Sequence, residues 1–373
     1  MKAAVATINA LFIVIGLAGT IAFFYRKGGT VRRKSPDSTQ NSNHSTVYSS
    51  SIIPAWMHSN VMSNYFMSGS TSSEHKLSDS SLVFIHHPRS GGQNLIHCLN
   101  NISFSKDLPM SPLMTSENRL LWESGSSASN TFRNRLKIHR GMYSAGMCQN
   151  LNKKCSYMML VRDPLQRSIS SHKHCFNSPN DDICGSRDAR ETSLRDWILS
   201  EGSVLLKHFL MSPKFCEANI LDKYNISLDF SKHISCWTKS NLILDKMIES
   251  QKTHVTNFIV ENLHKFISVI GLTEEFELSL KMFEASFQLP FTKCNFENRK
   301  RTRREMELNS NRAFSENRGH QSVQEDLSME EADDYSFKDD IEIQEALSSD
   351  YAIYKEAKRI FHIQKQFLLN TVR

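Results

Sequence analysis

The sequence is short of glycine, proline and cysteine, with 14, 9 and 8 of these residues among 373. A collagen-like protein would need glycine at about one position in three, and a small disulfide scaffold would need far denser cysteine. Beyond residue 25, no apolar run approaches the roughly 20 residues that cross a bilayer as a helix, which excludes a polytopic membrane protein. The hydrophobic content of 39% excludes wholesale disorder and allows one large domain with appendages.

Charge is distributed unevenly along the chain. Residues 325–345 hold ten Asp or Glu and one Lys, a net charge of −9 in a chain whose net charge is +6. The other residues together therefore carry +15, which favours an anionic ligand. We predict an acidic loop insertion over 324–346. The basic run at 299–304 is either a surface loop or a contact for an anionic glycan.

The N-terminal region contains 23 consecutive uncharged residues, 3–25. This length predicts an uncleaved transmembrane signal-anchor after a cytoplasmic tail of residues 1–2, with a cleaved signal peptide as the alternative. The basic residues just beyond it would keep the chain in the cytosol by the positive-inside rule. Three Asn-x-Ser glycosylation sequons, at Asn43, Asn101 and Asn225, favour the lumenal side instead.

The rest of the chain divides into a stem and a domain. Of residues 35–80, 18 are Ser or Thr with no apolar period, so we predict a flexible stem over 26–80. From residue 81 the composition changes, and strand-like apolar runs alternate with helical periodicity. The runs are 82–85 and 157–161, and the helical segments are 193–199, 274–287 and 353–367. This alternation predicts an α/β domain over 81–373, with a central parallel sheet flanked by helices.

The first strand runs into a loop with two adjacent glycines, F-I-H-H-P-R-S-G-G-Q at 84–93. Glycine lets the backbone approach a ligand closely, and the start of the following helix offers free N–H groups to a phosphate. Arg89 adds a positive charge and Ser90 a hydroxyl. The pattern G-x-x-x-x-G-K-[ST] of nucleotide triphosphatases is absent, and an ordinary turn is the alternative interpretation.

The second strand is followed by V-R-D-P-L-Q-R-S-I-S at 161–170. Arg162 stands at the carboxyl end of the strand, where ligands bind in open parallel sheets. Pro164 suits the first turn of a helix, and Ser170 follows about two turns later. Arg162 and Ser170 are therefore placed to bind one phosphate together.

The two segments resemble the motifs of Golgi carbohydrate sulfotransferases that use 3′-phosphoadenosine 5′-phosphosulfate (PAPS). Those motifs are close to F-I-H-x-x-K-T-G-G-T and L-R-D-P-x-x-R-x-x-S, and here they occur in the same order. Residues 269–276 resemble a late strand-to-helix element of that family, and 351–361 resemble its closing helix. L-N-S-N-R-A at 308–313 is similar to a stretch of the heparan sulfate 6-O-sulfotransferase branch, the closest match.

The resemblance implies a P-loop-like sulfotransferase domain that transfers a sulfuryl group from PAPS to a hydroxyl of a glycan, without a metal. The expected acceptor is an anionic glycosaminoglycan of heparan sulfate type, and no nucleic acid partner is expected. The implied location is the Golgi membrane, as a single-pass type II protein with a lumenal catalytic domain. Residues expected to bind the donor are Arg89, Ser90, Gly91, Gly92, Gln93, Asn94, Arg162 and Ser170, and Ser310 and Arg312 are candidates for further contacts.

The branch carries a catalytic histidine shortly before the second strand, and His139 is the candidate for this general base. Arg89 is the other expected catalytic residue. It stands where the family usually has Lys, and Gln93 stands where the family has a hydroxyl residue. Because Arg keeps its charge but does not lose its proton, these departures favour one alternative, a catalytically degenerate protein that only binds its ligands. Tyrosylprotein sulfotransferase is the other alternative.

Lumenal placement would let the cysteines form disulfides. Pairing neighbours along the chain gives Cys148–Cys155, Cys175–Cys184 and Cys216–Cys236, which leaves Cys98 for Cys294. This is one of 105 connectivities that eight cysteines allow.

Overall fold

The structure is a computed structural model of the chain, in which residues 53–58, 80–125, 130–151, 153–185, 187–217, 220–226, 235–294 and 337–371 are placed well enough to describe. All of these belong to one compact unit that spans Tyr48–Arg373. The predicted anchor at 3–25 lies outside the described residues. Within the described ranges, no helix is long and apolar enough to cross a membrane.

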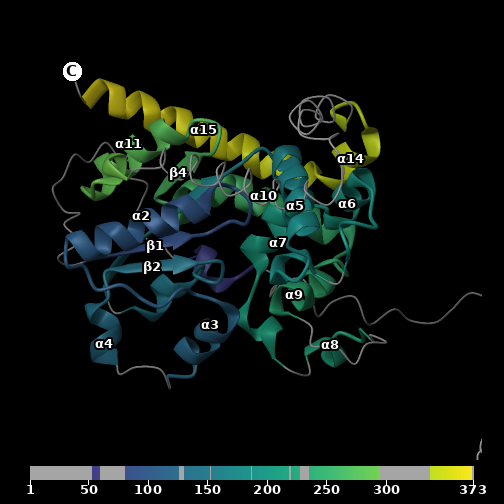
Figure 1. Cartoon of the computed structure of the whole chain (residues 1–373), viewed down its shortest axis with the longest axis horizontal. Helices are drawn as coiled ribbons and strands as arrows, with labels where there is room; N and C mark the ends of the chain where they lie inside the picture. Colours follow the sequence, from purple (N-terminus) through teal and green to yellow (C-terminus); the bar gives the residue numbers. More distant parts are fainter. Residues whose placement is uncertain are drawn as a thin grey trace, which may run out of the picture. The chain divides into compact units, whose positions relative to one another are not determined.

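The described part is an α/β fold built on a four-stranded parallel sheet (Figure 1). The strands are β1 (Ser80–Ile85), β2 (Ile138–Gly141), β3 (Lys154–Val161) and β4 (Val269–Leu272), in the order β2-β1-β3-β4. Val83 of β1 lies beside His139 of β2 and Tyr157 of β3, and Met159 of β3 lies beside Ile270 of β4. The predicted strands at 82–85 and 157–161 are confirmed as parts of β1 and β3.

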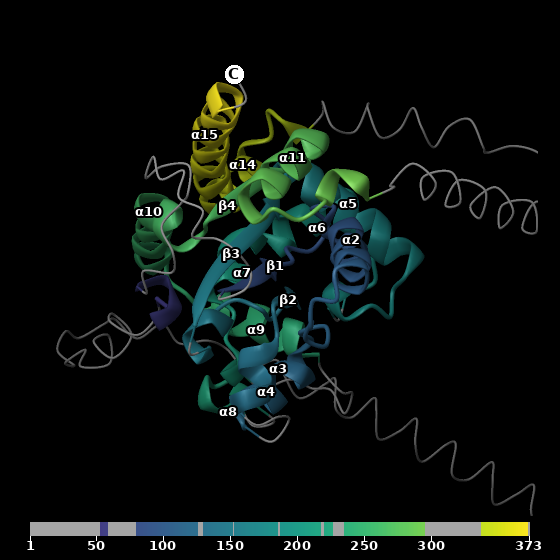
Figure 2. The ribbon, with the colours of Figure 1, turned by 90° about the vertical axis from the view of Figure 1, so that its left-hand side faces the viewer.

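Helices flank this sheet, as predicted. Figure 2 shows α10 and α15 on one side of the strands and α2 on the other. The α-helices are α2 (Gly92–Ser105), α3 (Ser116–Glu123), α4 (Asn130–Arg135), α5 (Pro164–Asn177), α6 (Leu194–Glu201), α7 (Val204–Leu210), α8 (Ile220–Lys223), α9 (Cys236–Leu244), α10 (Glu249–Phe266), α11 (Phe276–Phe287), α14 (Ile341–Ala346) and α15 (Ser348–Thr371). Short 3-10 helices are η1 (Ala55–His58), η3 (Met147–Asn150), η4 (Asp182–Cys184), η5 (Pro213–Cys216) and η6 (Phe291–Lys293).

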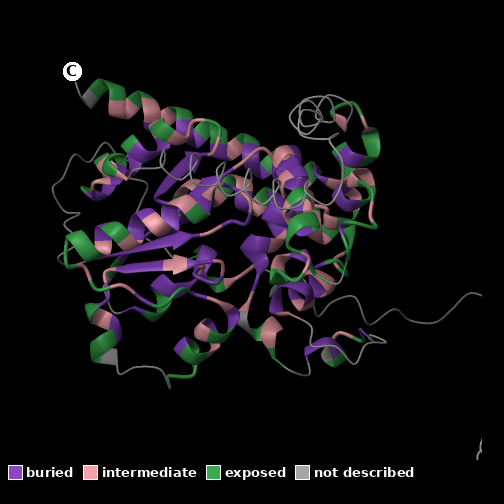
Figure 3. Ribbon diagram, in the orientation of Figure 1, coloured by how far each residue is buried: buried purple, intermediate pink, exposed green. Residues whose placement is uncertain are grey.

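The strands form the centre of the hydrophobic core. All six residues of β1 are buried, as are the last seven of β3, and Figure 3 shows the strands coloured almost entirely as buried. Continuous apolar runs of this kind are expected where helices cover both faces of a parallel sheet. The same runs made β1 and β3 visible in the sequence.

Four disulfides are present, three between cysteines close in sequence and one across 196 residues. They are Cys98–Cys294, Cys148–Cys155, Cys175–Cys184 and Cys216–Cys236. This is the predicted connectivity, and it is compatible with a secreted or lumenal protein. The bridge from Cys98 to Cys294 ties α2 to the chain just after η6 across 196 residues.

Most of the predicted stem and of the predicted acidic loop lies outside the described residues, and the parts that are described differ from the prediction in two places. The stem was expected to extend over 26–80, but Ala55–His58 form η1, and Trp56 and Met57 are buried in the core. The physical reason is that Trp56 and Met57 are large apolar side chains, and burying them in the hydrophobic core is favourable. The acidic loop expected over 324–346 is also too long. Its end, Ile341–Ala346, is helix α14, which buries Ile343.

Candidate functional site

The connections that leave β1, β3 and β4 meet at the carboxyl edge of the sheet. After β1 the chain forms a loop at 86–91, which we call the β1–α2 loop, and enters α2 at Gly92. Arg89 and Gly91 have positive φ angles of 64° and 75°. This conformation is free for glycine but costs about 1 kcal/mol or more for a residue with a side chain. Strain of this kind at Arg89 is typical of a functional loop.

At position 92 glycine is needed because there is no room for a side chain. A Cβ atom at this position would lie 2.2 Å from Cδ2 of His86 and 2.8 Å from its Nε2. The loop backbone is therefore packed directly on the His86 ring. The N–H groups in the first turn of an α-helix lack i−4 carbonyl partners, and a helix start of this kind can bind an anion. In α2 one of them, the backbone N–H of Asn94, already donates to the carbonyl of Gly91.

Arg89 reaches the second predicted segment directly. Its Nε and Nη2 donate to the Ser170 hydroxyl at 3.3 and 3.1 Å. Ser170 is held in place by α5, which begins with Pro164 and is capped by Asp163, whose carboxylate accepts from the amide of Gln166 at 3.1 Å. The two sequence segments, which are 81 residues apart at this contact, thus form one site.

Two further contacts fix the loop against β3 and β4. Nη1 of Arg162 donates to the carbonyl of Arg89 at 3.3 Å. The Thr273 hydroxyl lies 2.9 Å from the carbonyl oxygen of Ser90 and 3.0 Å from that of Val161. Thr273 follows β4 and was not singled out in the sequence, although it lies within the 269–276 element. Its hydroxyl connects the ends of β3 and β4 to the β1–α2 loop.

The second arginine of the second segment, Arg167, has an internal partner. Arg167 is 2% exposed, and its Nη2 donates to the Glu201 carboxylate at 2.7 Å, which also accepts from Ser171 at 2.7 Å. This carboxylate offsets the charge of Arg167. Arg89 and Arg162, both only partly buried, are the cations of the predicted set that a ligand at this edge can reach.

The remaining residues of the first segment differ in exposure. The Ser90 hydroxyl is fully buried and has no hydrogen-bond partner, which is an unsatisfied polar group inside the loop. Gln93 is exposed, and its amide lies 3.4 Å from Nε2 of His97. Asn94 is half-buried, and its backbone N–H donates to the carbonyl of Gly91 at 3.2 Å.

The structure does not join His139 to this group of residues by any contact within the described ranges. His139 lies inside β2, is 0% exposed, and packs edge-on against Trp122, with ring centroids 5.4 Å apart. Neither ring nitrogen has a hydrogen-bond partner. Burial, and then the cations Lys153 and Arg119, lower the pKa of His139 to about 3. It is thus a neutral imidazole enclosed in the core.

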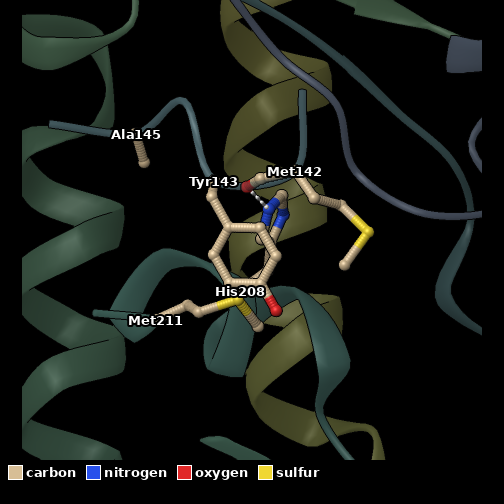
Figure 4. A pocket seen from close by; sticks show the side chains of 5 residues that line it. All are labelled: Met142, Tyr143, Ala145, His208 and Met211. Carbon is tan, nitrogen blue, oxygen red and sulfur yellow. Dashed lines mark hydrogen bonds between the residues drawn. The ribbon is translucent and has the colours of Figure 1, made fainter. Parts of the chain in front are cut away.

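A different pair of histidines lies at the end of β1. Nδ1 of His87 is 3.1 Å from Nδ1 of His208, which comes from α7. Nε2 of His208 lies 2.8 Å from the carbonyl oxygen of Met142, just beyond β2. Figure 4 shows this bond at the pocket that His208 lines with Met142, Tyr143, Ala145 and Met211. No sequence pattern indicated His208, because it lies in a short helix far from either motif.

The other predicted sites are placed as follows. Asn101 and Asn225 are exposed, as glycosylation requires, whereas Asn43, Ser310, Arg312 and the basic run at 299–304 lie outside the described residues. Among the described residues, no group of three or more His, Cys, Asp or Glu could hold a metal ion.

The arrangement offers helix amides, two reachable guanidinium groups and a buried hydroxyl at one edge of the sheet, which is the chemistry of a phosphate or sulfate site. Comparison of the chain with models of known protein families and with curated proteins gives no match to either.

Proposed function

We propose that the chain is a PAPS-dependent O-sulfotransferase, similar to the Golgi carbohydrate sulfotransferases. The observation that supports this most is the contact between Arg89 and Ser170. The sequence resemblance assigned these two residues to opposite ends of one donor molecule. Their contact at the carboxyl edge of a parallel sheet is what a shared nucleotide site would require.

The residues present fit the donor. PAPS, when bound, supplies the sulfuryl group and two anionic ends. The 5′-phosphosulfate would be bound by three groups. They are the buried Ser90 hydroxyl, which lacks a partner, the amides at the start of α2, and the Arg89 guanidinium. Arg162 and Ser170 suit the 3′-phosphate, and Ser310 and Arg312 would add contacts by the resemblance.

During transfer, the task of these residues is to hold and stabilise charge. Donors that are already positioned where charge develops usually contribute the largest part of catalysis. The Arg89 guanidinium, held by Ser170, would stabilise negative charge near the leaving phosphate. Because it does not lose its proton, it cannot act as the general acid that a Lys could be.

The proposed acceptor is a hydroxyl of an anionic glycan, of the heparan sulfate type. The net charge of +15 outside the acidic stretch supports this choice, since it would attract a polyanion. We further propose a single-pass Golgi membrane protein with the domain in the lumen. The four disulfides and the exposed sequons at Asn101 and Asn225 support this placement.

A second candidate is a protein of this fold that binds its ligands without turnover. Arg89 in place of Lys favours it, and so does the enclosed position of His139, the base that the resemblance implies. The two candidates share the nucleotide site and differ only in chemistry.

The test uses the full chain, purified in detergent and incubated with ³⁵S-labelled PAPS. The acceptors are desulfated heparan, chondroitin and a tyrosine-containing acidic peptide, and binding of adenosine 3′,5′-bisphosphate is measured by calorimetry on the same sample. Label in the glycan supports the proposal. Label only in the peptide would make the chain a tyrosylprotein sulfotransferase, and binding without label would favour the second candidate.

Two variants locate the site. Arg89→Ala should lower the transfer rate by about 10²-fold or more, as loss of a positioned donor does elsewhere. Arg359→Ala is the matched control, because Arg359 is an exposed arginine on α15 that pairs with Glu356. Equal activity in both variants, or no nucleotide binding by the folded wild-type chain, would overturn the proposal.

A further inference from the structure

The pair formed by His87 and His208 has the geometry of an N–H···N hydrogen bond. The two Nδ1 atoms are 3.1 Å apart, the ring centroids are 5.2 Å apart, and the ring planes are inclined by only 24°. Because the centroids are much farther apart than the two nitrogen atoms, the rings meet edge to edge. One Nδ1 must carry a proton and donate the hydrogen bond to the other, so the pair has a definite proton arrangement.

The carbonyl of Met142 determines that arrangement. A carbonyl oxygen only accepts, so Nε2 of His208 carries the proton in its 2.8 Å bond to Met142 (Figure 4). A neutral imidazole has one N–H group, which leaves Nδ1 of His208 as an acceptor. Nδ1 of His87 must therefore donate, and Nε2 of His87 keeps its lone pair.

Burial keeps both rings neutral in the free protein. It is the largest cause that lowers the pKa of His208 to about 4, and it lowers the pKa of His87 well below its usual range. The charged or titratable groups that face His87 are His208 on α7, Arg167 on α5 and His86 on its own loop. Each of these also disfavours an imidazolium at His87.

His87 and His208 are 3% and 1% exposed, nearly as buried as His139, but unlike His139 they lie next to the two segments proposed to bind the donor. His87 precedes Arg89 by two residues, and Arg167, on the same helix as Ser170, faces it. His86 lies close enough to both Arg89 and His208 for their charges to lower its own pKa. His139, in contrast, has Lys153, Arg119 and Trp122 as its neighbours.

We propose that His87 is the general base of the transfer, that its Nε2 accepts the proton of the acceptor hydroxyl, and that His208 is the positioning residue that holds His87 in the required tautomer. This inference depends on the sulfotransferase activity proposed above. The acceptor oxygen forms a bond to sulfur while the bond from sulfur to the 5′-phosphate oxygen breaks, and the electron pair of that bond leaves with the phosphate. The proton moves to Nε2 of His87, and the bond from its Nδ1 through His208 to the Met142 carbonyl stabilises the positive charge.

Donor binding would raise the basicity of His87. In the free protein, burial, the neighbouring histidines and the charge of Arg167 lower its pKa. An anionic nucleotide beside Arg89 and Arg162 adds negative charge close to the ring, which favours the protonated form. The base would therefore approach a useful pKa only when the donor is present.

The first test reads the protons directly and needs no acceptor. The full chain, labelled with ¹⁵N in its histidines, is examined by long-range ¹H–¹⁵N correlation at neutral pH, and the substitutions His87→Gln and His208→Phe assign the signals. We expect His87 protonated at Nδ1 and His208 at Nε2, and a higher pKa of His87 when adenosine 3′,5′-bisphosphate is added. A His87 protonated at Nε2, or a pKa that the bound nucleotide leaves unchanged, would overturn the inference.

The second test is kinetic and uses ³⁵S release from PAPS, with the best acceptor or with water. His87→Gln should lower kcat by about 10²–10⁴-fold, the usual share of a general base, with nucleotide affinity within about twofold of wild type. His208→Phe, which keeps a ring of similar size, should lower kcat less and alter the pH profile of kcat. His174→Gln, at a partly exposed histidine of α5 that pairs with Asp181, should match wild type.

The outcomes separate this inference from the function on which it depends. If wild type binds the nucleotide and transfers sulfate, retained activity in His87→Gln together with lost activity in His139→Gln would return the base role to His139. If folded wild type neither binds the nucleotide nor releases sulfate, the proposed function itself fails, and the inference fails with it.

Discussion

Trp56 packs edge-to-face against Phe266, with ring centroids 5.2 Å apart and an interplanar angle of 81°. The same indole contacts Tyr157 of β3, at 5.4 Å between centroids. A residue from the segment expected to be a flexible stem therefore packs against both a central strand and the end of α10. The folded unit includes residues that precede β1.

We predict that Trp56→Ala lowers the free energy of unfolding by about 3–5 kcal/mol, the usual cost of removing a buried aromatic ring. Chemical denaturation followed by fluorescence or circular dichroism measures this change. Phe104→Ala is the control, because the Phe104 side chain is 91% exposed and should contribute little. A loss below about 1 kcal/mol for Trp56→Ala, similar to the control, would mean that η1 is not part of the core.

Ser170→Ala should weaken binding of adenosine 3′,5′-bisphosphate by about tenfold or more, because a hydrogen bond to a charged group is removed and Arg89 loses its support. Titration calorimetry measures the affinity. Ser200→Ala removes a hydroxyl on α6 that bonds to the carbonyl of Trp197, and should leave the affinity unchanged. Equal affinity in both variants would remove Ser170 from the site.

The raised pKa of Asp350 should make the free energy of unfolding depend on pH. Its buried carboxylate accepts from the amides of Leu205 and Leu206 at 2.8 and 2.9 Å, yet burial raises its pKa to about 6. Because the folded pKa is above the unfolded value, the folded state holds this proton more tightly. The stabilisation is complete below the unfolded pKa and is lost as the pH rises through the folded one.

The difference in unfolding free energy between wild type and Asp350→Asn isolates this group, since the other titrations cancel. We expect wild type to lose about 3 kcal/mol relative to the variant between the unfolded pKa and about 6. Above that range the difference should be constant. A difference that is flat throughout, or that rises with pH, would show that the carboxyl pKa is not raised.

The disulfides should differ in what they contribute. In the chain-entropy account, a bridge stabilises more when it closes a longer loop, with about 3 kcal/mol for 15 residues and about 5 kcal/mol for 100. Replacing both Cys98 and Cys294 by Ala, which opens a loop of 196 residues, should therefore lower Tm more than replacing Cys148 and Cys155, which are 7 apart. Differential scanning calorimetry compares the two variants, and the reverse order would contradict the expectation.

The sequence predicted the features that depend on local patterns. Apolar runs located β1 and β3, and the glycine pair located the β1–α2 loop. Pairing of neighbouring cysteines predicted three disulfides, and the fourth, Cys98–Cys294, was the pair that remained. Strand β2 was missed because its four residues, I-H-R-G, include two polar ones and show no apolar run. His208 was missed because its contact with His87 joins positions 121 residues apart in the chain, which no local pattern encodes.

The elements that complete the sheet edge and support α7 come late in the chain, which affects folding during synthesis. Strand β4, which covers the outer edge of β3, begins only at Val269, and Asp350 of α15 binds the amides at the start of the helix that carries His208. A nascent chain can pair β1, β2 and β3 early, but β3 then has an open edge of the kind that invites misassociation. The edge of the sheet that carries Arg89 and the histidine pair can therefore be completed only after α15 has been synthesised. A stop codon placed before α15 should for this reason prevent this edge from folding, although both of its loops precede α15 in the chain.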